Sequence, residues 1–260
     1  MEAFTITFCD VGENHAGMQM LGSRADKGFS VAQLRKVASD MQAMGIGVEI
    51  VDLGGDSYPE AIVLVIRNGV REMAHVDPEA LYESLQSMPT DSKAFMRGTV
   101  KNKRARKNNC IADFRQDPNY EMGCGTVVQF ADYPIVQQLR LAVSKTFEFA
   151  LEPAQTLVAE LNHYFDVNKC GIGWHGDAER RLVVGVRSGK GSGAMPLKFQ
   201  WFSRWNPVGD EVGIPLAHGD MYVLSDKAVG YDWKTNVKGL TLRHASGAMK
   251  YSASKKKKAC

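Results

Sequence analysis

The sequence of 260 residues lacks the features that would place it in several common classes. No apolar run reaches the roughly 18 residues that a membrane-spanning helix needs, and the segment from Met1 to Cys9 lacks the basic start and apolar core of a signal peptide. The five cysteines are odd in number, widely spaced and without a CxxC pair, which argues against a disulfide framework and a cysteine zinc site. We therefore expect an intracellular protein, cytoplasmic or nuclear and not secreted, with reduced thiols and no membrane partner.

A large charge of one sign is also absent, because 32 basic residues stand against 29 acidic ones. The distribution is uneven: six basic residues and no acidic one lie between Arg97 and Lys107, and four more form the run from Lys255 to Lys258. Removing these ten from the 32 leaves 22 basic residues against 29 acidic ones. The sequence therefore predicts an acidic body with two basic patches, and its net charge of +3 does not by itself indicate a nucleic-acid partner.

The first 90 residues are predicted to form a small α/β unit, to which the sequence assigns no role. Ser30 and Gln33 make a capping box, and the apolar spacing after them predicts a helix that ends near Gly45. Strands are predicted at residues 4–8, 48–53 and 61–66, and a short helix at residues 78–85. A cluster of turn residues at 88–92 separates this unit from the rest.

The second part, residues 91–254, is predicted to contain helices at 134–149 and 153–160, followed by a series of short strands. The spacing of the strand-like runs, about 8 to 12 residues, is typical of a β-sandwich or a barrel. These runs cover residues 161–165, 171–175, 182–187, 197–202, 212–217, 220–225, 229–234 and 239–245.

The clearest candidate for chemistry is a histidine and an aspartate at the end of a predicted strand. His175 and Asp177 are two residues apart, and alternate residues of a strand point to the same side, so imidazole and carboxylate can share one metal ion. A non-haem Fe(II) site needs two histidines and one carboxylate on one face, which leaves open positions for other ligands. A surface pair without metal is the alternative interpretation of so short a motif.

Several ordered elements around this pair make residues 155–247 resemble the AlkB-like family of Fe(II)- and 2-oxoglutarate-dependent dioxygenases. The family's pair of 2-oxoglutarate-binding residues, its iron motif and its carboxylate-clamping arginine match, in this order, Asn162 and Tyr164, then His175, Asp177 and Glu179, then Arg243. The resemblance implies an α+β fold. Its C-terminal half would be a double-stranded β-helix, or jelly-roll, barrel with helices packed outside, preceded by the small α/β unit.

The third iron ligand is left open by the resemblance. The family's second iron-binding histidine lies on the penultimate strand, and in the natural alignment this position falls at Asp232. His244 supplies an imidazole, but it follows Arg243, and neighbours on a strand point to opposite faces unless a bulge intervenes. His244 and Asp232 are therefore alternative third ligands. Lys234 and Lys238 are alternative candidates for a second contact to the 2-oxoglutarate anion.

Two further features are candidates for substrate binding. The resemblance implies that Glu179 contacts the substrate, and a carboxylate suits the exocyclic amine of a base; an ion pair with a neighbouring arginine is the alternative. The basic segment 97–109 is predicted to form a lid whose cations contact phosphates, although a solvated charge run or a nuclear localisation signal has the same composition. Its candidate residues are Lys101, Lys103, Arg104 and Arg106.

We therefore expect an enzyme that uses Fe(II), 2-oxoglutarate and O₂ to hydroxylate, and thereby to demethylate oxidatively, a nucleic-acid base. Such a base has to be single-stranded or flipped out of a duplex to reach a metal inside a barrel. Two alternatives remain: the same chemistry on a protein side chain or a small molecule, and a barrel without iron that binds nucleic acid or protein. The sequence does not indicate an oligomeric state.

Overall fold

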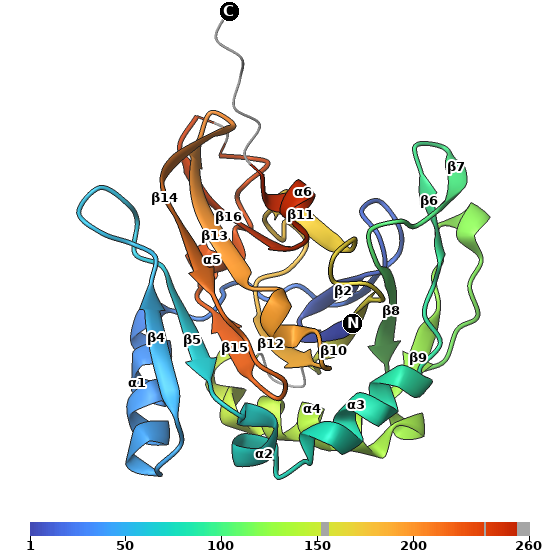
Figure 1. The fold of residues 1–260 in the computed structure, drawn as a ribbon, viewed down its shortest axis with the longest axis horizontal. Helices are drawn as coiled ribbons and strands as arrows, with labels where there is room; N and C mark the ends of the chain where they lie inside the picture. Colours follow the sequence, from blue (N-terminus) through green and yellow to red (C-terminus); the bar gives the residue numbers. More distant parts are fainter. Residues whose placement is uncertain (152–155, 237, 254–260) are drawn as a thin grey trace, which may run out of the picture.

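The computed structural model describes residues 1–151, 156–236 and 238–253, which have a mixed α+β fold with mostly antiparallel sheets (Figure 1). The predicted lysine-rich tail at 255–260 lies outside the described residues. Within the described ranges, no helix has the length and apolar character needed to cross a membrane.

The larger sheet has eight strands in the order β4-β5-β15-β12-β1-β10-β8-β9. Every neighbouring pair is antiparallel except β8 and β9, which are parallel. The strands are β1 (Ala3–Cys9), β4 (Val48–Asp52), β5 (Ile62–Ile66), β8 (Lys107–Ala112), β9 (Val127–Gln129), β10 (Val158–Tyr164), β12 (Val183–Ser188) and β15 (Met221–Leu224).

The smaller sheet has four antiparallel strands in the order β11-β16-β13-β14. They are β11 (Gly171–His175), β13 (Leu197–Ser203), β14 (Asn206–Ile214) and β16 (Leu240–Gly247). Two separate hairpins pair β2 (Val11–Glu13) with β3 (Met20–Gly22) and β6 (Lys93–Met96) with β7 (Thr99–Asn102). No strand pairing in the described part of the chain joins the two larger sheets into a closed barrel.

The helices formed by residues 31–43, 69–74, 78–87 and 134–146 lie along the outer side of the eight-stranded sheet, and the two short helices at 226–229 and 249–252 lie by the smaller sheet (Figure 1). The helix predicted from the capping box is confirmed as α1, which begins after Ser30. The helices are α1 (Val31–Ala43), α2 (Gly69–Ala74), α3 (Pro78–Ser87), α4 (Pro134–Thr146), α5 (Asp226–Val229) and α6 (Met249–Ser252). Single turns of 3₁₀-helix occur at Tyr120–Met122, Phe130–Asp132, Glu148–Ala150 and Ser192–Ala194.

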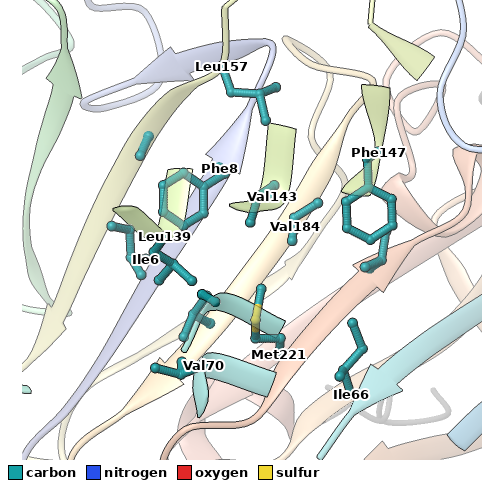
Figure 2. Close-up of a cluster of buried hydrophobic side chains, with 14 of the residues drawn as sticks. Ile6, Phe8, Ile66, Val70, Leu139, Val143, Phe147, Leu157, Val184 and Met221 are labelled. Atoms are coloured by element: carbon teal, nitrogen blue, oxygen red, sulfur yellow. The ribbon is translucent and has the colours of Figure 1, made fainter. Parts of the chain in front are cut away.

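Strand β1 illustrates how the sequence separates the two faces of the large sheet. Its even-numbered residues, Phe4, Ile6 and Phe8, belong to the buried apolar cluster beneath the helices, part of which is drawn in Figure 2. Successive strand residues point to opposite faces, so Thr5 and Thr7 face the other side, where they line a cavity. The face under the helices is therefore apolar core. The opposite face packs in part against the small sheet through a second apolar cluster, and its polar residues line the cavity.

The sequence indicated that the first 90 residues form a separate unit. In the structure they do not. Strand β1 lies between β10 and β12, and β5 pairs with β15, so strands from both parts of the chain make one sheet. The expected boundary at 88–92 is a connection within that fold. Local sequence patterns identify the strands but carry no information about such distant partners.

Two predicted elements are wrong. Residues 158–160 begin strand β10 instead of ending a helix, and residues 153–155 of that expected helix lie outside the described part. Residues 229–234 are not a strand: helix α5 ends at Val229, Gly230 has a left-handed φ of 72°, and turns follow. Asp232 therefore lies in a turn and not on a strand of the small sheet.

Candidate metal centre

A cavity of about 440 Å³ lies between the two larger sheets. One wall consists of residues from β1, β10, β12 and β15, and the opposite wall of residues from β11, β13 and β16. Polar and charged side chains from both walls meet in this cavity. Most of the residues that the sequence singled out can be placed relative to it.

Three side chains at one point of this cavity could hold a metal ion. His175 ends β11, Asp177 follows it, and His244 on β16 is the direct partner of His175 across the two strands. One ligand atom from each of the three lies within 4.8 Å of the others. The Nε2 atoms of both histidines are 3.6 Å from Oδ1 of Asp177.

The hydrogen bonding of His175 suits metal binding. Its Nδ1 is 2.7 Å from the carbonyl oxygen of Gly173, an interaction that requires the proton on Nδ1 and leaves the lone pair on Nε2, toward Asp177. Burial, together with the neighbouring His244, lowers the pKa of His175 to about 3. The imidazole is therefore neutral at physiological pH, which is the form that ligates metals.

The carboxylate of Asp177 is kept ionised by its surroundings. Burial alone would raise its pKa, but the charges of Arg180 and His244 outweigh burial and hold the pKa well below its ordinary value. An ionised carboxylate beside the neutral imidazole of His175 supplies two of the donors that a divalent cation requires.

The structure brings His244, and not Asp232, to His175 and Asp177. Nζ of Lys227 is 2.6 Å from Oδ2 of Asp232, in the turn after α5. Neighbouring residues of β16 point to opposite faces, as expected. The residue expected to face inward was Arg243, but in the structure it is His244. His244 faces the cavity, and Arg243 faces away from it.

Arg243, the expected clamp for a carboxylate of 2-oxoglutarate, is not among the residues that line the cavity. Its guanidinium carbon lies 4.3 Å from the ring centre of Phe202, 4.6 Å from that of Trp205 and 5.2 Å from that of Trp233. It is held among these three aromatic rings, of which only Trp233 also lines the cavity. Lys234, the expected second anion contact, does line the cavity.

The expected co-substrate pair does face the cavity. Asn162 and Tyr164 are alternate residues of β10, and both line it. Nε of Arg106 donates to Oδ1 of Asn162, and Nδ2 of Asn162 lies 3.3 Å from Oε1 of Glu160. Arg106, from the basic segment, is thus part of the cavity wall.

Sequence reasoning missed Arg187, a fully buried arginine of β12 in the cavity wall. Its Nη2 donates to Oγ of Ser246 at 3.2 Å, whereas Nε and Nη1 have no partner among the described residues. The signal was present: apart from its last residue, Ser188, the strand Val183–Ser188 is otherwise without polar side chains, and Arg187 has the parity of Val183, which also faces the cavity. A buried guanidinium with free donors is unfavourable by itself, and an anion that accepts hydrogen bonds from these donors stabilises it.

Arg180 links the metal centre to two further carboxylates. Its Nη2 is 2.6 Å from Oε2 of Glu160 and 2.8 Å from Oε1 of Glu179, and its Nε is 4.0 Å from Oδ2 of Asp177. Glu179 therefore makes the ion pair that the sequence offered as the alternative to substrate contact, yet it also lines the cavity. Burial and the nearby charges of Asp177 and Glu160 raise the pKa of Glu179 to about 7.

The basic segment does not act as one surface. Lys103 is partly buried, donates to Oδ1 of Asn14 at 2.7 Å and to Oδ1 of Asn108, and has its pKa lowered by burial to about 8. It therefore stabilises the loops and is not free to contact phosphates. Lys101 and Arg104 line a second, more open groove beside Tyr120, formed with the β6–β7 hairpin.

Comparison with known proteins gives one strong match. The chain is 42% identical over 258 residues to the uncharacterized protein R156 of Acanthamoeba polyphaga mimivirus, and the match covers 96% of this chain and 97% of that protein. No protein-family model matches the sequence. The similarity extends over nearly the whole length of both chains and therefore includes both sheets and the cavity between them.

Proposed function

We propose that this chain, which belongs to the same family as mimivirus protein R156, is an Fe(II)- and 2-oxoglutarate-dependent dioxygenase. The observation that carries the proposal is the cluster of His175, Asp177 and His244, whose ligand atoms lie within 4.8 Å of one another in a cavity. Two histidines and one carboxylate on one face are typical of non-haem Fe(II) oxygenases. When bound there, Fe(II) with 2-oxoglutarate and O₂ would supply the oxidising power to hydroxylate a C–H bond of the substrate.

The strand orders support a jelly-roll fold of the resembled AlkB-like type, with one rearrangement. If β10 is counted first and β1 last, the central strands of the large sheet have the order 6-3-8-1, and the small sheet has the order 2-7-4-5. These are the orders of a jelly roll. In this numbering β16 would be the penultimate strand, and His244 would have the position of the family's second iron-binding histidine. The eighth strand would then come from the N-terminal end of the chain.

Arg187 is the residue that we propose for anchoring a carboxylate of 2-oxoglutarate, in place of Arg243. Its two donors without a described partner and its burial favour an anionic ligand, because a carboxylate pairs with a guanidinium through two hydrogen bonds. Asn162 and Tyr164 on the neighbouring wall would add hydrogen bonds. The cavity thus has a cationic residue for the co-substrate and a separate donor set for the metal.

For the substrate we propose a nucleic-acid base. Glu179, in the cavity wall, is suited to receive hydrogen bonds from an exocyclic amine. Lys101 and Arg104, in the second groove, are suited to neutralise phosphates of the flanking chain. Because the metal centre lies inside a cavity, a base would have to be single-stranded or flipped to reach it.

An absorbance experiment without oxygen tests the metal and co-substrate assignment. Wild-type protein with Fe(II) and 2-oxoglutarate should give a weak visible charge-transfer band. We expect His175→Ala and His244→Ala to abolish the band, while the matched variant Asp232→Asn retains it. Absence of the band in the wild type would contradict the proposal and favour a domain that only binds.

Succinate formation against a panel of methylated oligonucleotides then tests the substrate class. We expect succinate to rise above the substrate-free level with at least one methylated single strand, and formaldehyde to appear in equal amount. A wild type that forms the band but responds to no oligonucleotide would keep the oxygenase and reject the nucleic-acid substrate.

A further inference from the structure

Trp233 occupies a special position beside the metal ligands. It lines the cavity, and it comes from the turn after α5 and not from a strand. The backbone between His175 and Asp177 packs against its ring, because a Cβ atom at Gly176 would lie 2.8 Å from Cδ1 of Trp233. Trp233 is therefore an aromatic wall directly next to the candidate metal centre.

Trp205 continues this aromatic surface outward. Its ring centre lies 6.1 Å from that of Trp233, the two planes are inclined by 73°, and Arg243 contacts both rings. Half of Trp205 (50%) is exposed, whereas Phe202, the third aromatic residue on Arg243, is only 6% exposed. Two tryptophans therefore lead from the cavity to the exterior, with Arg243 holding them in place.

The backbone conformation of the turn that carries Trp205 is unfavourable for a tryptophan. Arg204 and Trp205 form the two-residue connection between β13 and β14, and both have left-handed backbone angles, with φ of 47° and 71°. Such turns prefer Asn-Gly, because side chains with a Cβ are strained in this region. The turn geometry thus does not explain a tryptophan at 205, and its half exposure means that core packing does not explain it either.

We propose that Trp233 and Trp205 are specificity-determining residues that receive the planar ring of the substrate, with Trp233 stacking on the reacting base and Trp205 on its neighbour in the strand. This inference rests on the proposed function and adds to it the surface that recognises the substrate. Stacking of a base on an aromatic side chain contributes roughly fivefold to more than a hundredfold in affinity. Stacking accepts any base, so the tryptophans would orient the ring of the base. Glu179 would discriminate between bases by hydrogen bonding to the edge of that ring.

The test compares two fluorescent trinucleotides that differ only in whether the central position carries a methylated adenine or no base. We expect wild type to bind the first at least tenfold more tightly in an anisotropy titration. Trp233→Leu should reduce this ratio to near one. Trp205→Gly, which relieves the turn, should weaken both trinucleotides at least threefold without lowering the melting temperature.

Phe202→Leu is the matched control, because it also removes an aromatic contact of Arg243 but lies outside the cavity wall. This variant should keep the wild-type ratio. Three results would each overturn the proposal. The affinity ratio could stay unchanged in Trp233→Leu, it could fall as much in Phe202→Leu as in Trp233→Leu, or wild type could bind both trinucleotides equally. Since the titration needs neither Fe(II) nor 2-oxoglutarate, its failure is distinguishable from failure of the absorbance experiment.

Discussion

The rings of His175 and His244 have centres 4.4 Å apart across the pairing of β11 with β16. On its other side β16 pairs with β13, where Phe199 is the partner of His244. A slip of β16 by one residue would turn Arg243 or Ala245 toward the cavity in its place. The candidate metal centre is thus set by the register of three strands.

Metal binding should stabilise the protein only if all three candidate ligands are present. Mn(II) at about a hundredfold its Kd should raise the melting temperature by roughly 5 °C or more. Asp232→Asn should show the same rise and His244→Ala none, as measured by differential scanning fluorimetry. An equal rise in His244→Ala would remove this residue from the site.

Arg187→Met should separate binding from stability. We expect the loss of a buried charge-assisted contact to weaken 2-oxoglutarate binding by about a hundredfold, roughly 3 kcal/mol. The protein without ligand should not be destabilised, because a guanidinium with two unpaired buried donors is itself unfavourable. Calorimetric titration and urea unfolding measure the two effects. The comparison variant is Arg243→Met, for which the Kd of 2-oxoglutarate should stay close to that of wild type.

Arg180→Met should destabilise the fold strongly. The change leaves Glu160, Glu179 and Asp177 as buried carboxylates without their shared cation, at a cost of about 3–5 kcal/mol in unfolding free energy. Adding Glu160→Gln to this variant should restore part of the loss, because one unpaired charge is removed. Independent, additive effects in a double-mutant cycle would show that the two residues are not coupled.

Lys103 should make stability increase with pH in an alkaline window. Its pKa is lowered from 10.5 to about 8 in the folded protein, so between these values the unfolded chain binds more protons than the folded one. The free energy of unfolding contributed by this group therefore rises by up to about 1.4 kcal/mol per pH unit from pH 8 to 10.5. Lys103→Met should lack this rise in urea unfolding measured at several pH values. Parallel profiles of the two proteins would contradict the assignment.

A chain cut after Pro89 provides a test of the shared sheet. The C-terminal piece alone lacks β1 and β5 and should show no cooperative urea transition. Both pieces produced together should assemble and recover one. Cooperative folding of the C-terminal piece by itself would restore the two-unit organisation that the sequence suggested.

Local signals in the sequence predicted local structure well. The capping box of Ser30 and Gln33 begins α1, and the apolar run at 61–66 contains the buried strand β5. The prediction of a strand at 229–234 was wrong, because the aromatic residues of this segment lie in turns after Gly230. Spacing alone does not distinguish a strand from an aromatic turn.

The site was predictable where it depends on one strand and not where it depends on strands that meet. His175 and Asp177 follow from their spacing at the end of β11. His244 was set against Arg243 by a correct rule of alternation, but which of the two faces inward depends on the pairing of β16 with β11 and β13. Arg187 could be identified as a site residue only with the knowledge that one face of β12 borders a polar cavity.

The central place of β1 in the large sheet also bears on how the chain is made. Residues 3–9 are synthesised well before their strand neighbours at 158–164 and 183–188, so β1 lacks both strand partners while the intervening residues are made. Pairings of such large sequence separation form slowly, and unpaired apolar strands attract chaperones and other nascent chains. Strand β1 is thus enclosed in the sheet only after β10 and β12, which follow it far along the chain, have been synthesised.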